Sequence, residues 1–313
     1  PISDECGLMF PIIPANTATA ASANDEGIFG YGHTPSLVST TNLVSNAGVV
    51  SSDVTGVGTA RYYLAACEYG GDKGIFGFGN NGSYVSMTNL VSNAGVVASD
   101  QAATTGTARD GPAACEYGGD KGIFGFGYTG SVTGVTNLVS NAGVVASDVA
   151  GVGTARKQVA ACEYGGDKGI FGFGNDGSYA SMTNLVSNTG VVASDQAATT
   201  GTDRAYLAAC SFGGDKGIFG FGYCGAPLHY TNITNLVSNT GVVASDTAGV
   251  GPDRQSPGAC EYDGDKGIFG FGHDGVGGRV SSTQLVSNAG VVASNQAATT
   301  GTARCYLAAC SFN

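Results

Sequence analysis

Residues 71–79 read Gly-Asp-Lys-Gly-Ile-Phe-Gly-Phe-Gly, and almost the same letters return every 47–50 residues along the chain. A worn copy, Asn-Asp-Glu-Gly-Ile-Phe-Gly-Tyr-Gly, occupies residues 24–32. Self-similarity at a fixed period of this length indicates a repeat architecture, in which each unit buries its faces against its neighbours. The remaining copies are residues 119–127, 166–174, 214–222 and 264–272.

The second unit shows four short segments of β type. Arg61–Tyr69 and Gly74–Phe78 flank a Gly-Gly-Asp-Lys turn, and Met87–Ser92 and Val96–Asp100 flank an Asn-Ala-Gly turn. Glycine and aspartate supply the positive φ that tight turns need, and the chain has no helical period. These features predict an all-β protein. Four strands in each of six units predict a six-bladed β-propeller of four-stranded blades.

The two ends of the array complete one blade. The array begins with a second strand, residues 27–31, and ends with a first strand, residues 304–312. Pairing these strands would leave no open edge, so we expect the C-terminal strand to close the ring on the N-terminal blade. The predicted organisation is an arm at residues 1–23 and a propeller at residues 24–313.

The arm is apolar from Cys6 to Pro14 and then rich in Ala, Thr and Ser. It either packs on its own ring or inserts into a neighbouring subunit as an added strand. The chain begins at Pro1 rather than Met. This start is typical of a processed extracellular protein from which a signal peptide was removed, and a fragment or an incomplete sequence would begin in the same way.

The charge balance excludes several partners. The net charge is −11, with 13 basic residues, so neither nucleic acid nor an anionic membrane would find a positive surface. No apolar run approaches the roughly 20 residues that span a bilayer. We expect no nucleic-acid binding and no membrane insertion.

The unit Arg…Ala-Ala-x-Tyr-Gly-Gly-Asp-Lys-x-Ile-x-Gly-x-Gly resembles a Kelch-type propeller repeat. More closely, it resembles the Kelch-like arrays that read DK-x-IFG-x-G…TNLVSN-x-GVV in phage, viral and environmental surface proteins. The resemblance covers residues 24–313 and implies a scaffold or binding propeller. The chain departs from standard Kelch units because it has no Trp and has Gly-Phe-Gly in place of a Gly-Gly pair. These departures weaken any transfer of Kelch partner biology.

An arginine begins the first strand of each unit and follows the end of the previous unit by eight or nine positions. The residue at that distance before the arginine, at the end of the previous unit, is acidic in every case but the last, where Asn295 precedes Arg304 by nine positions. We expect bidentate pairs between blades, weakest at Asn295. The pairs are Asp53–Arg61, Asp100–Arg109, Asp148–Arg156, Asp195–Arg204 and Asp246–Arg254.

Most of the cysteines share one repeat position, where we expect small buried residues on the innermost strands. These are Cys67, Cys115, Cys162, Cys210, Cys260 and Cys310. Cys6, Cys224 and Cys305 fall outside this set. In an oxidising compartment we expect one disulfide among those three, and a Cys6–Cys305 bond would tie the arm to the closing blade. No Cys/His spacing is typical of zinc, and no metal or cofactor is expected.

Variation between units concentrates in the loop after the second strand. Aromatic and imidazole side chains there form a candidate ligand site on one mouth of the ring. They are His33, Tyr128, Tyr223, His229, Tyr230 and His273. Two sequons in the same loops, Asn81-Gly-Ser and Asn232-Ile-Thr, would accept N-glycans in a secreting eukaryote.

No nucleophile elbow, zinc-protease motif or phosphate loop is present in the sequence. We therefore expect no enzymatic activity. The leading hypothesis is a structural propeller of an extracellular fibre or virion surface, which assembles with itself through its arm and presents the variable loops. The alternative is a lectin-like propeller that binds glycans.

Overall fold

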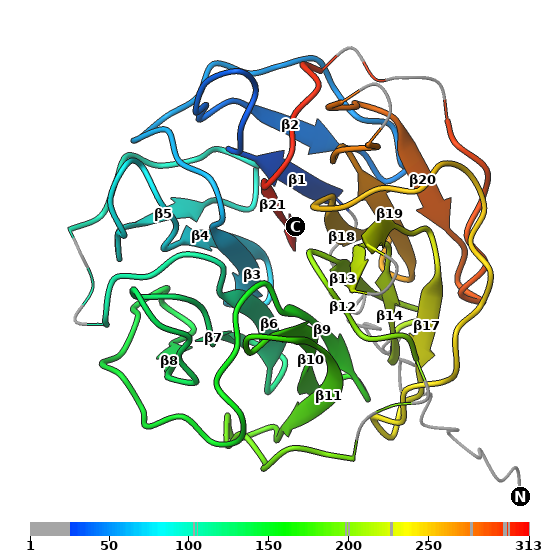
Figure 1. Cartoon of the computed structure of the whole chain (residues 1–313). Coiled ribbons are helices and arrows are strands. Elements are labelled where there is room, and N and C mark those ends of the chain that lie inside the picture. Colours follow the sequence, from blue (N-terminus) through cyan, green and yellow to red (C-terminus); the bar gives the residue numbers. More distant parts are fainter. Residues whose placement is uncertain are drawn as a thin grey trace, which may run out of the picture.

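The computed structural model describes residues 26–312, except positions 103, 105, 198, 200, 226–227, 276–277, 297–298 and 300. All regular elements in this part of the chain are β-strands, so the predicted all-β class is confirmed. The strands form three-stranded antiparallel sheets, and Figure 1 shows the main ones arranged about a common centre. We name the six repeat sheets A (β2-β1-β21), B (β3-β4-β5), C (β6-β7-β8), D (β9-β10-β11), E (β13-β14-β17) and F (β18-β19-β20).

Each repeat sheet has an inner, a middle and an outer strand. The middle strand has the sequence Lys-Gly-Ile-Phe-Gly or, in sheet A, Glu-Gly-Ile-Phe-Gly. The inner strands are β3 (Ala65–Tyr69), β6 (Ala113–Tyr117), β9 (Ala160–Tyr164), β13 (Ala208–Phe212), β18 (Gly258–Tyr262) and β21 (Ala308–Phe312). The middle strands are β1 (Glu26–Gly30), β4 (Lys73–Gly77), β7 (Lys121–Gly125), β10 (Lys168–Asn175), β14 (Lys216–Gly220) and β19 (Lys266–Gly270). The outer strands are β2 (Thr41–Val44), β5 (Thr88–Val91), β8 (Thr136–Val139), β11 (Tyr179–Val186), β17 (Thr234–Val237) and β20 (Thr283–Val286). A small additional sheet joins β12 (Arg204–Ala205), β15 (Tyr223–Gly225) and β16 (Leu228–Tyr230).

The glycines of the middle strand explain why these sheets stack face to face. A Cβ on Gly74 would lie 2.5 Å from the Sγ of Cys310 in sheet A, and one on Gly77 would lie 2.7 Å from the Phe124 ring of sheet C. The two glycines of each middle strand therefore leave room for a cysteine side chain of the preceding sheet and a phenylalanine ring of the following sheet. Because both faces are covered, the strand reads as an apolar run rather than an alternating one.

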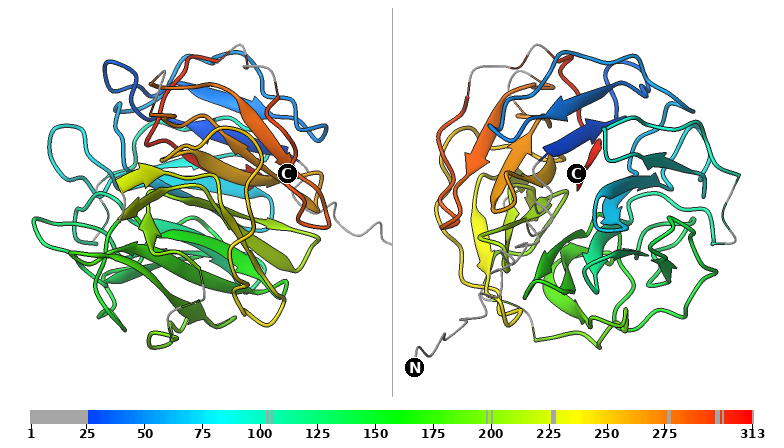
Figure 2. Two further views of the ribbon diagram at one scale, coloured as in Figure 1. Left: turned by 45° about the vertical axis from the view of Figure 1, so that its right-hand side comes forward. Right: turned by 180° about the vertical axis from the view of Figure 1, so that it is seen from behind.

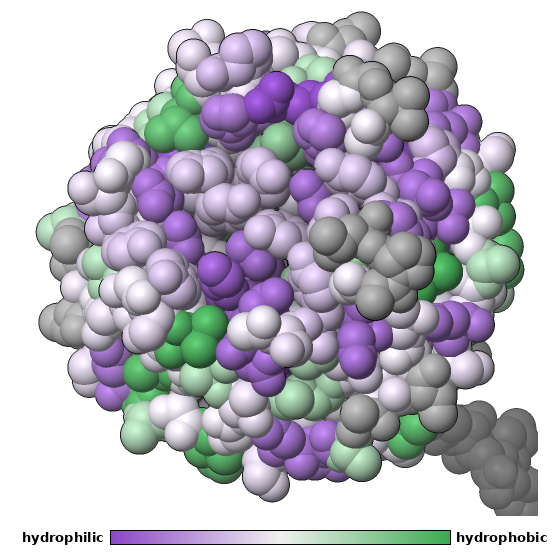
Figure 3. All heavy atoms as spheres, viewed as in Figure 1, coloured by the Kyte–Doolittle hydropathy of each residue, from purple (hydrophilic) through white to green (hydrophobic). Residues whose placement is uncertain are grey.

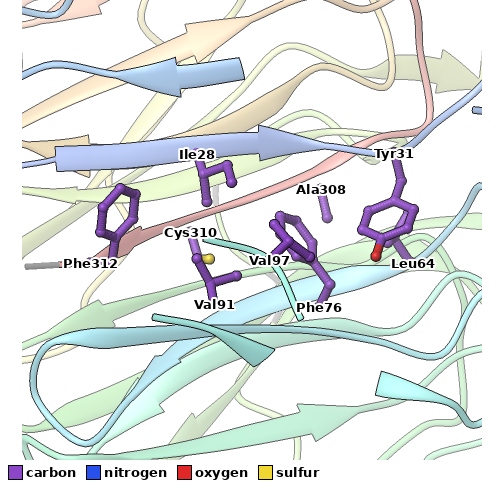
Figure 4. Packing of buried hydrophobic residues seen from close by; sticks show 9 residues of the cluster. All are labelled: Ile28, Tyr31, Leu64, Phe76, Val91, Val97, Ala308, Cys310 and Phe312. Carbon is purple, nitrogen blue, oxygen red and sulfur yellow. The ribbon is translucent and has the colours of Figure 1, made fainter. Parts of the chain in front are cut away.

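The last strand pairs with the first, as predicted. β1 lies between β2 and β21, with Glu26 opposite Phe312 and Gly30 opposite Ala308. The apolar cluster between sheets A and B joins both chain ends to the second repeat (Figure 4). Its members are Ile28, Tyr31, Leu64, Phe76, Val91, Val97, Ala308, Cys310 and Phe312.

A cycle of backbone hydrogen bonds links the segments that lead into the inner strands. Each N–H donates to a carbonyl of the preceding sheet, and the residue that donates the sixth bond is the one that accepts the first. The donors and acceptors are Tyr63 to Tyr306, Gly111 to Tyr63, Gln158 to Gly111, Tyr206 to Gln158, Ser256 to Tyr206 and Tyr306 to Ser256. The views in Figure 2 show the same arrangement of sheets obliquely, after a turn of 45°, and from behind.

The fourth predicted strand of each unit is not a regular strand, so the four-stranded blade is wrong in this detail. In sheet B the segment after the turn makes one bridge, Val91 to Val97. Its other backbone bonds run from Ser92 to Val96, from Ala98 to Leu90 and, just beyond the segment, from Gln101 to Thr88. The Ala98 carbonyl also accepts from the side chain of Asn89, at 3.0 Å. A side-chain amide therefore takes the place of further ladder bonds.

The glycine–cysteine contact gives a stability prediction. We expect Gly122→Ala to destabilise the fold by about 2–3 kcal/mol, because the new Cβ would lie 2.5 Å from the Cys67 Sγ. In the double variant with Cys67→Ala the sulfur is gone, so its loss of stability should be smaller than the sum of the two single losses. Urea unfolding measures both.

The control is Gly134→Ala, whose nearest neighbour would be 3.5 Å away. It should change the free energy of unfolding by less than about 0.5 kcal/mol. Strict additivity of the Gly122 and Cys67 changes would contradict the contact.

Candidate functional site

The repeated polar residues serve the scaffold. Arg61 is fully buried and donates from Nε to the Phe78 carbonyl (2.9 Å), and from its terminal nitrogens to the Thr59 carbonyl (3.2 Å) and Asn89 Oδ1 (2.7 Å). Its guanidinium also lies 4.4 Å from the centre of the Tyr31 ring in sheet A. A buried cation thus binds its own sheet by hydrogen bonds and the preceding sheet by a cation–π contact.

The other units repeat this stacking. In each pair the arginine belongs to one sheet and the aromatic ring to the preceding sheet. The pairs are Arg109 over Phe78, Arg156 over Phe126, Arg204 over Phe173, Arg254 over Phe221 and Arg304 over Phe271. The ring residues have positive φ, between 62° and 65°, a conformation that non-glycine residues rarely adopt. The Gly-Phe-Gly element places an aromatic ring under each arginine.

The predicted acid–arginine pairs between blades are wrong. The carboxylate nearest Arg61 is that of Asp100 in the same sheet, at 3.8 Å, and Asp53 instead lies 3.8 Å from Arg304. The other repeat arginines of the described residues with a carboxylate within 4 Å form the pairs Arg156–Asp195 and Arg204–Asp246. Asp148, predicted to pair with Arg156, likewise accepts from Thr107, two residues before Arg109. Each acid thus binds the segment that enters its own sheet, because the outermost segment returns beside it.

The carboxylates are held mainly by neutral donors. Asp100 accepts from the backbone and the hydroxyl of Thr59 and from Asn89 Nδ2. Burial alone would raise the pKa of Asp100, but the hydrogen bonds from Thr59 and Asn89 outweigh it and leave that pKa below its usual value. In sheet F, where Asn295 replaces the acid, Arg254 binds Gln284 Oε1 (2.6 Å) and Asn295 Oδ1 (2.8 Å). The relative weakness of that junction stays a prediction.

Glutamates gather in the channel that the inner strands enclose. Glu68, Glu116, Glu163 and Glu261 line one cavity of about 240 Å³ with the glycines of the adjoining turns. Sheets E and A carry Ser211 and Ser311 at the same position, and Ser311 Oγ donates to the Glu261 carbonyl (3.0 Å). Burial, then repulsion from Glu68, raises the pKa of Glu116 to about 10 and that of Glu163 to about 8. Burial also raises the pKa of Glu261 well above its usual value.

These glutamates predict that stability falls as the pH rises. Their folded-state pKa values exceed the unfolded values, so the folded chain binds more protons and the free energy of unfolding decreases above about pH 4.5. We expect the thermal midpoint to fall steadily from pH 5 to pH 9. In Glu116→Gln/Glu163→Gln that fall should be shallower. Equal slopes for the two proteins would contradict the assignment.

The loop face, formed by the segments after the middle strands and before the inner strands, brings together only part of the predicted ligand site. Tyr223 meets Tyr230 with ring centres 5.3 Å apart, and Tyr230 stacks on His273 at 5.6 Å. The ring of His33 lies 5.9 Å from that of Tyr62, and Arg279, the bridge partner of His273, donates to the His33 carbonyl (3.0 Å) and lies 2.7 Å from its Nδ1. Tyr128 packs with Tyr84 and Lys157 in another part of this face.

Three tyrosines that the sequence interpretation missed lie at the centre of the loop face. Tyr63, Tyr206 and Tyr306 occupy the position two residues after the repeat arginine. Tyr63 and Tyr306 have ring centres 4.4 Å apart, and Tyr206 lies 6.3 Å and 6.2 Å from them. They line a cavity of only about 80 Å³. The signal available in the sequence was this shared spacing from the arginine.

A larger groove lies between sheet D and the additional sheet β12-β15-β16. Its volume is about 490 Å³, and His229 is the one predicted ligand residue that lines it. The other lining residues are Asn175, Gly177, Ser178, Tyr179, Thr202, Asp203, Cys224 and Gly225. Sequence reasoning missed Asp203, although four of the other units have alanine at this position: Ala60, Ala108, Ala155 and Ala303.

The cysteines and sequons are placed as follows. The six cysteines of the repeat are buried free thiols, as are Cys224 and Cys305, so the structure contains no Cys224–Cys305 disulfide. Cys6 and the arm lie outside the described residues. Asn81 is exposed, whereas Asn232 Nδ2 donates to the Gly251 carbonyl (2.6 Å) and Thr234 of the same sequon is buried. Only the Asn81 sequon is open at the surface.

Comparison with known proteins adds no relative, since no family model and no curated protein matches this chain. Within the described residues, no group of three or more His, Cys, Asp or Glu side chains is arranged to hold a metal ion. The same part of the chain contains no helix whose length and apolarity would let it cross a bilayer.

Proposed function

We propose that the chain is a Kelch-like six-bladed β-propeller that acts as a non-catalytic structural scaffold. It belongs to an extracellular fibre or a virion surface, assembles with copies of itself through residues 1–23, and presents the loop face to other molecules. The observation that carries the proposal is the division of labour in the repeats. The repeated arginines and glycines join neighbouring sheets, the repeated Asn, Asp and Thr side chains hold each sheet to its entering segment, and the differing residues gather on the loop face.

The surface is consistent with a scaffold. Figure 3 shows hydrophobic side chains in separate spots among polar ones, rather than in one large apolar patch. Valines repeat at the turn after the outer strand, for example Val49 at 64% exposure and Val96 at 65%. They are spread one per sheet, so these valines of the described residues do not form one broad apolar patch of the kind that marks a fixed partner.

Removal of residues 1–23 tests the assembly part of the proposal. The truncated chain should keep its unfolding midpoint but give a monomer by light scattering, where the full chain gives larger species. Assemblies of equal size in both proteins would contradict a role for the arm. A full chain that stays monomeric would contradict self-assembly altogether.

A carbohydrate-binding propeller is the second candidate, and the groove beside Tyr179 favours it. Grooves of several hundred Å³ that combine an aromatic ring with hydroxyl, amide and carboxylate groups suit small polar ligands. A glycan array of the folded protein tests this candidate. Signals on a defined set of glycans would support it, and a blank array would contradict it.

A further inference from the structure

The groove between sheet D and the additional sheet is the ligand-sized hollow among the cavities described above. Its volume of about 490 Å³ falls within the 300–1,000 Å³ typical of small-molecule sites. The cavities along the axis hold about 50, 80 and 90 Å³, enough for ordered water only. The channel mouth lined by Glu68 reaches about 240 Å³, but acidic side chains and glycines surround it.

Departures from the repeat build this groove. In sheet D, β10 and β11 are each eight residues long, whereas the middle and outer strands of the other sheets have five and four. The added length includes the pairing of Asn175 with Tyr179, which sheet B forms as an isolated bridge between Asn80 and Tyr84, and this pairing makes one wall. The hairpin β15–β16 and Asp203, which stands where most units have alanine, make the opposite wall.

Tyr179 is held in place on this wall. Its ring meets Tyr223 edge to face, with centres 6.0 Å apart, and a Cβ on Gly225 would lie 2.6 Å from the ring. The glycine at 225 therefore lets the β15–β16 hairpin approach the tyrosine closely. A ring fixed in this way loses little conformational entropy when a ligand packs on it.

The lining chemistry points to a neutral, hydroxyl-rich ligand. Ser178 provides a hydroxyl, Asn175 an amide, Asp203 a carboxylate and His229 an imidazole, whereas the Thr202 hydroxyl donates to Asp246 (2.6 Å). The described residues that line the groove include no lysine or arginine, and the chain carries a net charge of −11, so an anionic ligand would be repelled. A carboxylate accepts strong hydrogen bonds from sugar hydroxyls, and an aromatic ring covers the apolar C–H face of a pyranose.

We propose that this groove binds a neutral oligosaccharide, with Tyr179 packing against a sugar ring and Asp203 accepting hydrogen bonds from its hydroxyls. The inference rests on the carbohydrate-binding candidate above and gives it a place and a ligand class. His229 and Asn175 contact the same ligand from the two walls.

The repeats supply a matched control at the junction of sheets B and C. Tyr84 follows Asn-Asn-Gly-Ser as Tyr179 follows Asn-Asp-Gly-Ser, and its ring lies 6.0 Å from Tyr128, as that of Tyr179 does from Tyr223. Ala108 stands there in place of Asp203. Tyr84→Ala thus removes the same side chain from the same kind of loop, outside the groove.

The test is calorimetric titration of the folded full chain with cellohexaose, mannohexaose, maltohexaose and chitohexaose. We expect at least one of these to bind, and Tyr179→Ala and Asp203→Asn to weaken it by about tenfold or more. Tyr84→Ala should leave the affinity unchanged. Thermal midpoints within error of the parent show that the variants are folded, and Asp203→Asn, which keeps size and shape, decides the case if Tyr179→Ala unfolds.

The outcomes separate the groove from the wider function. Binding that survives both groove substitutions, or that Tyr84→Ala weakens equally, overturns the groove proposal while carbohydrate binding stands. If the parent protein binds none of these sugars, the groove proposal is also overturned. A positive glycan array would then mean that carbohydrate binds at another site. The scaffold proposal is judged separately, by the size of assemblies with and without residues 1–23.

Discussion

A chain that ends at residue 303 will fail to fold cooperatively. It lacks β21, so β1 loses one of its two partners along the register from Glu26–Phe312 to Gly30–Ala308. It also loses Arg304, which is fully buried against Phe271 of sheet F. The apolar faces of sheets F and B then lie open, and units of a repeat array depend on such neighbours for their stability. Circular dichroism and urea unfolding should show no sharp transition.

A permuted chain is the control for this deletion. Residues 304–312 are moved in front of residue 26 and joined to it through Gly-Gly-Asp, the turn that connects the same strands in sheets B, C and D. The permuted chain should regain a cooperative transition close to that of the parent. Cooperative unfolding of the simple deletion, at the parental midpoint, would show that β21 is not needed for the fold.

Replacement of a repeat arginine will cause the next largest loss. Arg109 donates from Nε to the Phe126 carbonyl (2.8 Å) and from its terminal nitrogens to the Thr107 carbonyl (3.1 Å) and Asn137 Oδ1 (2.7 Å). Arg109→Met keeps much of the volume but leaves these buried acceptors without a donor. We expect the free energy of unfolding to drop by about 3–5 kcal/mol.

Lys121→Met in the same sheet is the matched control. Lys121 pairs with Asp120 at the surface, and exposed pairs of this kind contribute little to stability because water and salt screen them. The two variants lose the same kind of charge, one buried and one solvated. Similar losses in urea unfolding would contradict the structural role assigned to the arginine.

The strands of the scaffold could be predicted well from the sequence because the pattern of each strand recurs in several units. Turn residues between short apolar segments identified the inner, middle and outer strands. The array begins with a second strand and ends with a first strand, which predicted the pairing of β1 with β21. The fourth strand was overestimated because side-chain bonds, such as Asn89 to Ala98, compete with a backbone ladder. Spacing along the chain cannot reveal that competition.

The candidate site was harder to predict because its parts come from different units. We paired Asp53 with Arg61 because they are close in the sequence. In the structure the outermost segment of sheet A lies beside the segment that enters the same sheet, so Asp53 lies beside Arg304. The groove combines Tyr179 of sheet D with Asp203 and His229, which follow in the next unit. What marked these residues was their departure from the repeat, as at Asp203, where most units have alanine.

The most direct test of the ring is a disulfide across the two chain ends. Ile28 lies opposite Cys310 in the pairing of β1 with β21, so Ile28→Cys should form a disulfide with Cys310 under mild oxidation. Mass spectrometry of the folded, digested protein should then find residue 28 linked to residue 310. A folded protein in which the two thiols stay reduced, or in which residue 28 links to another cysteine, would contradict the closure of the ring by its own ends.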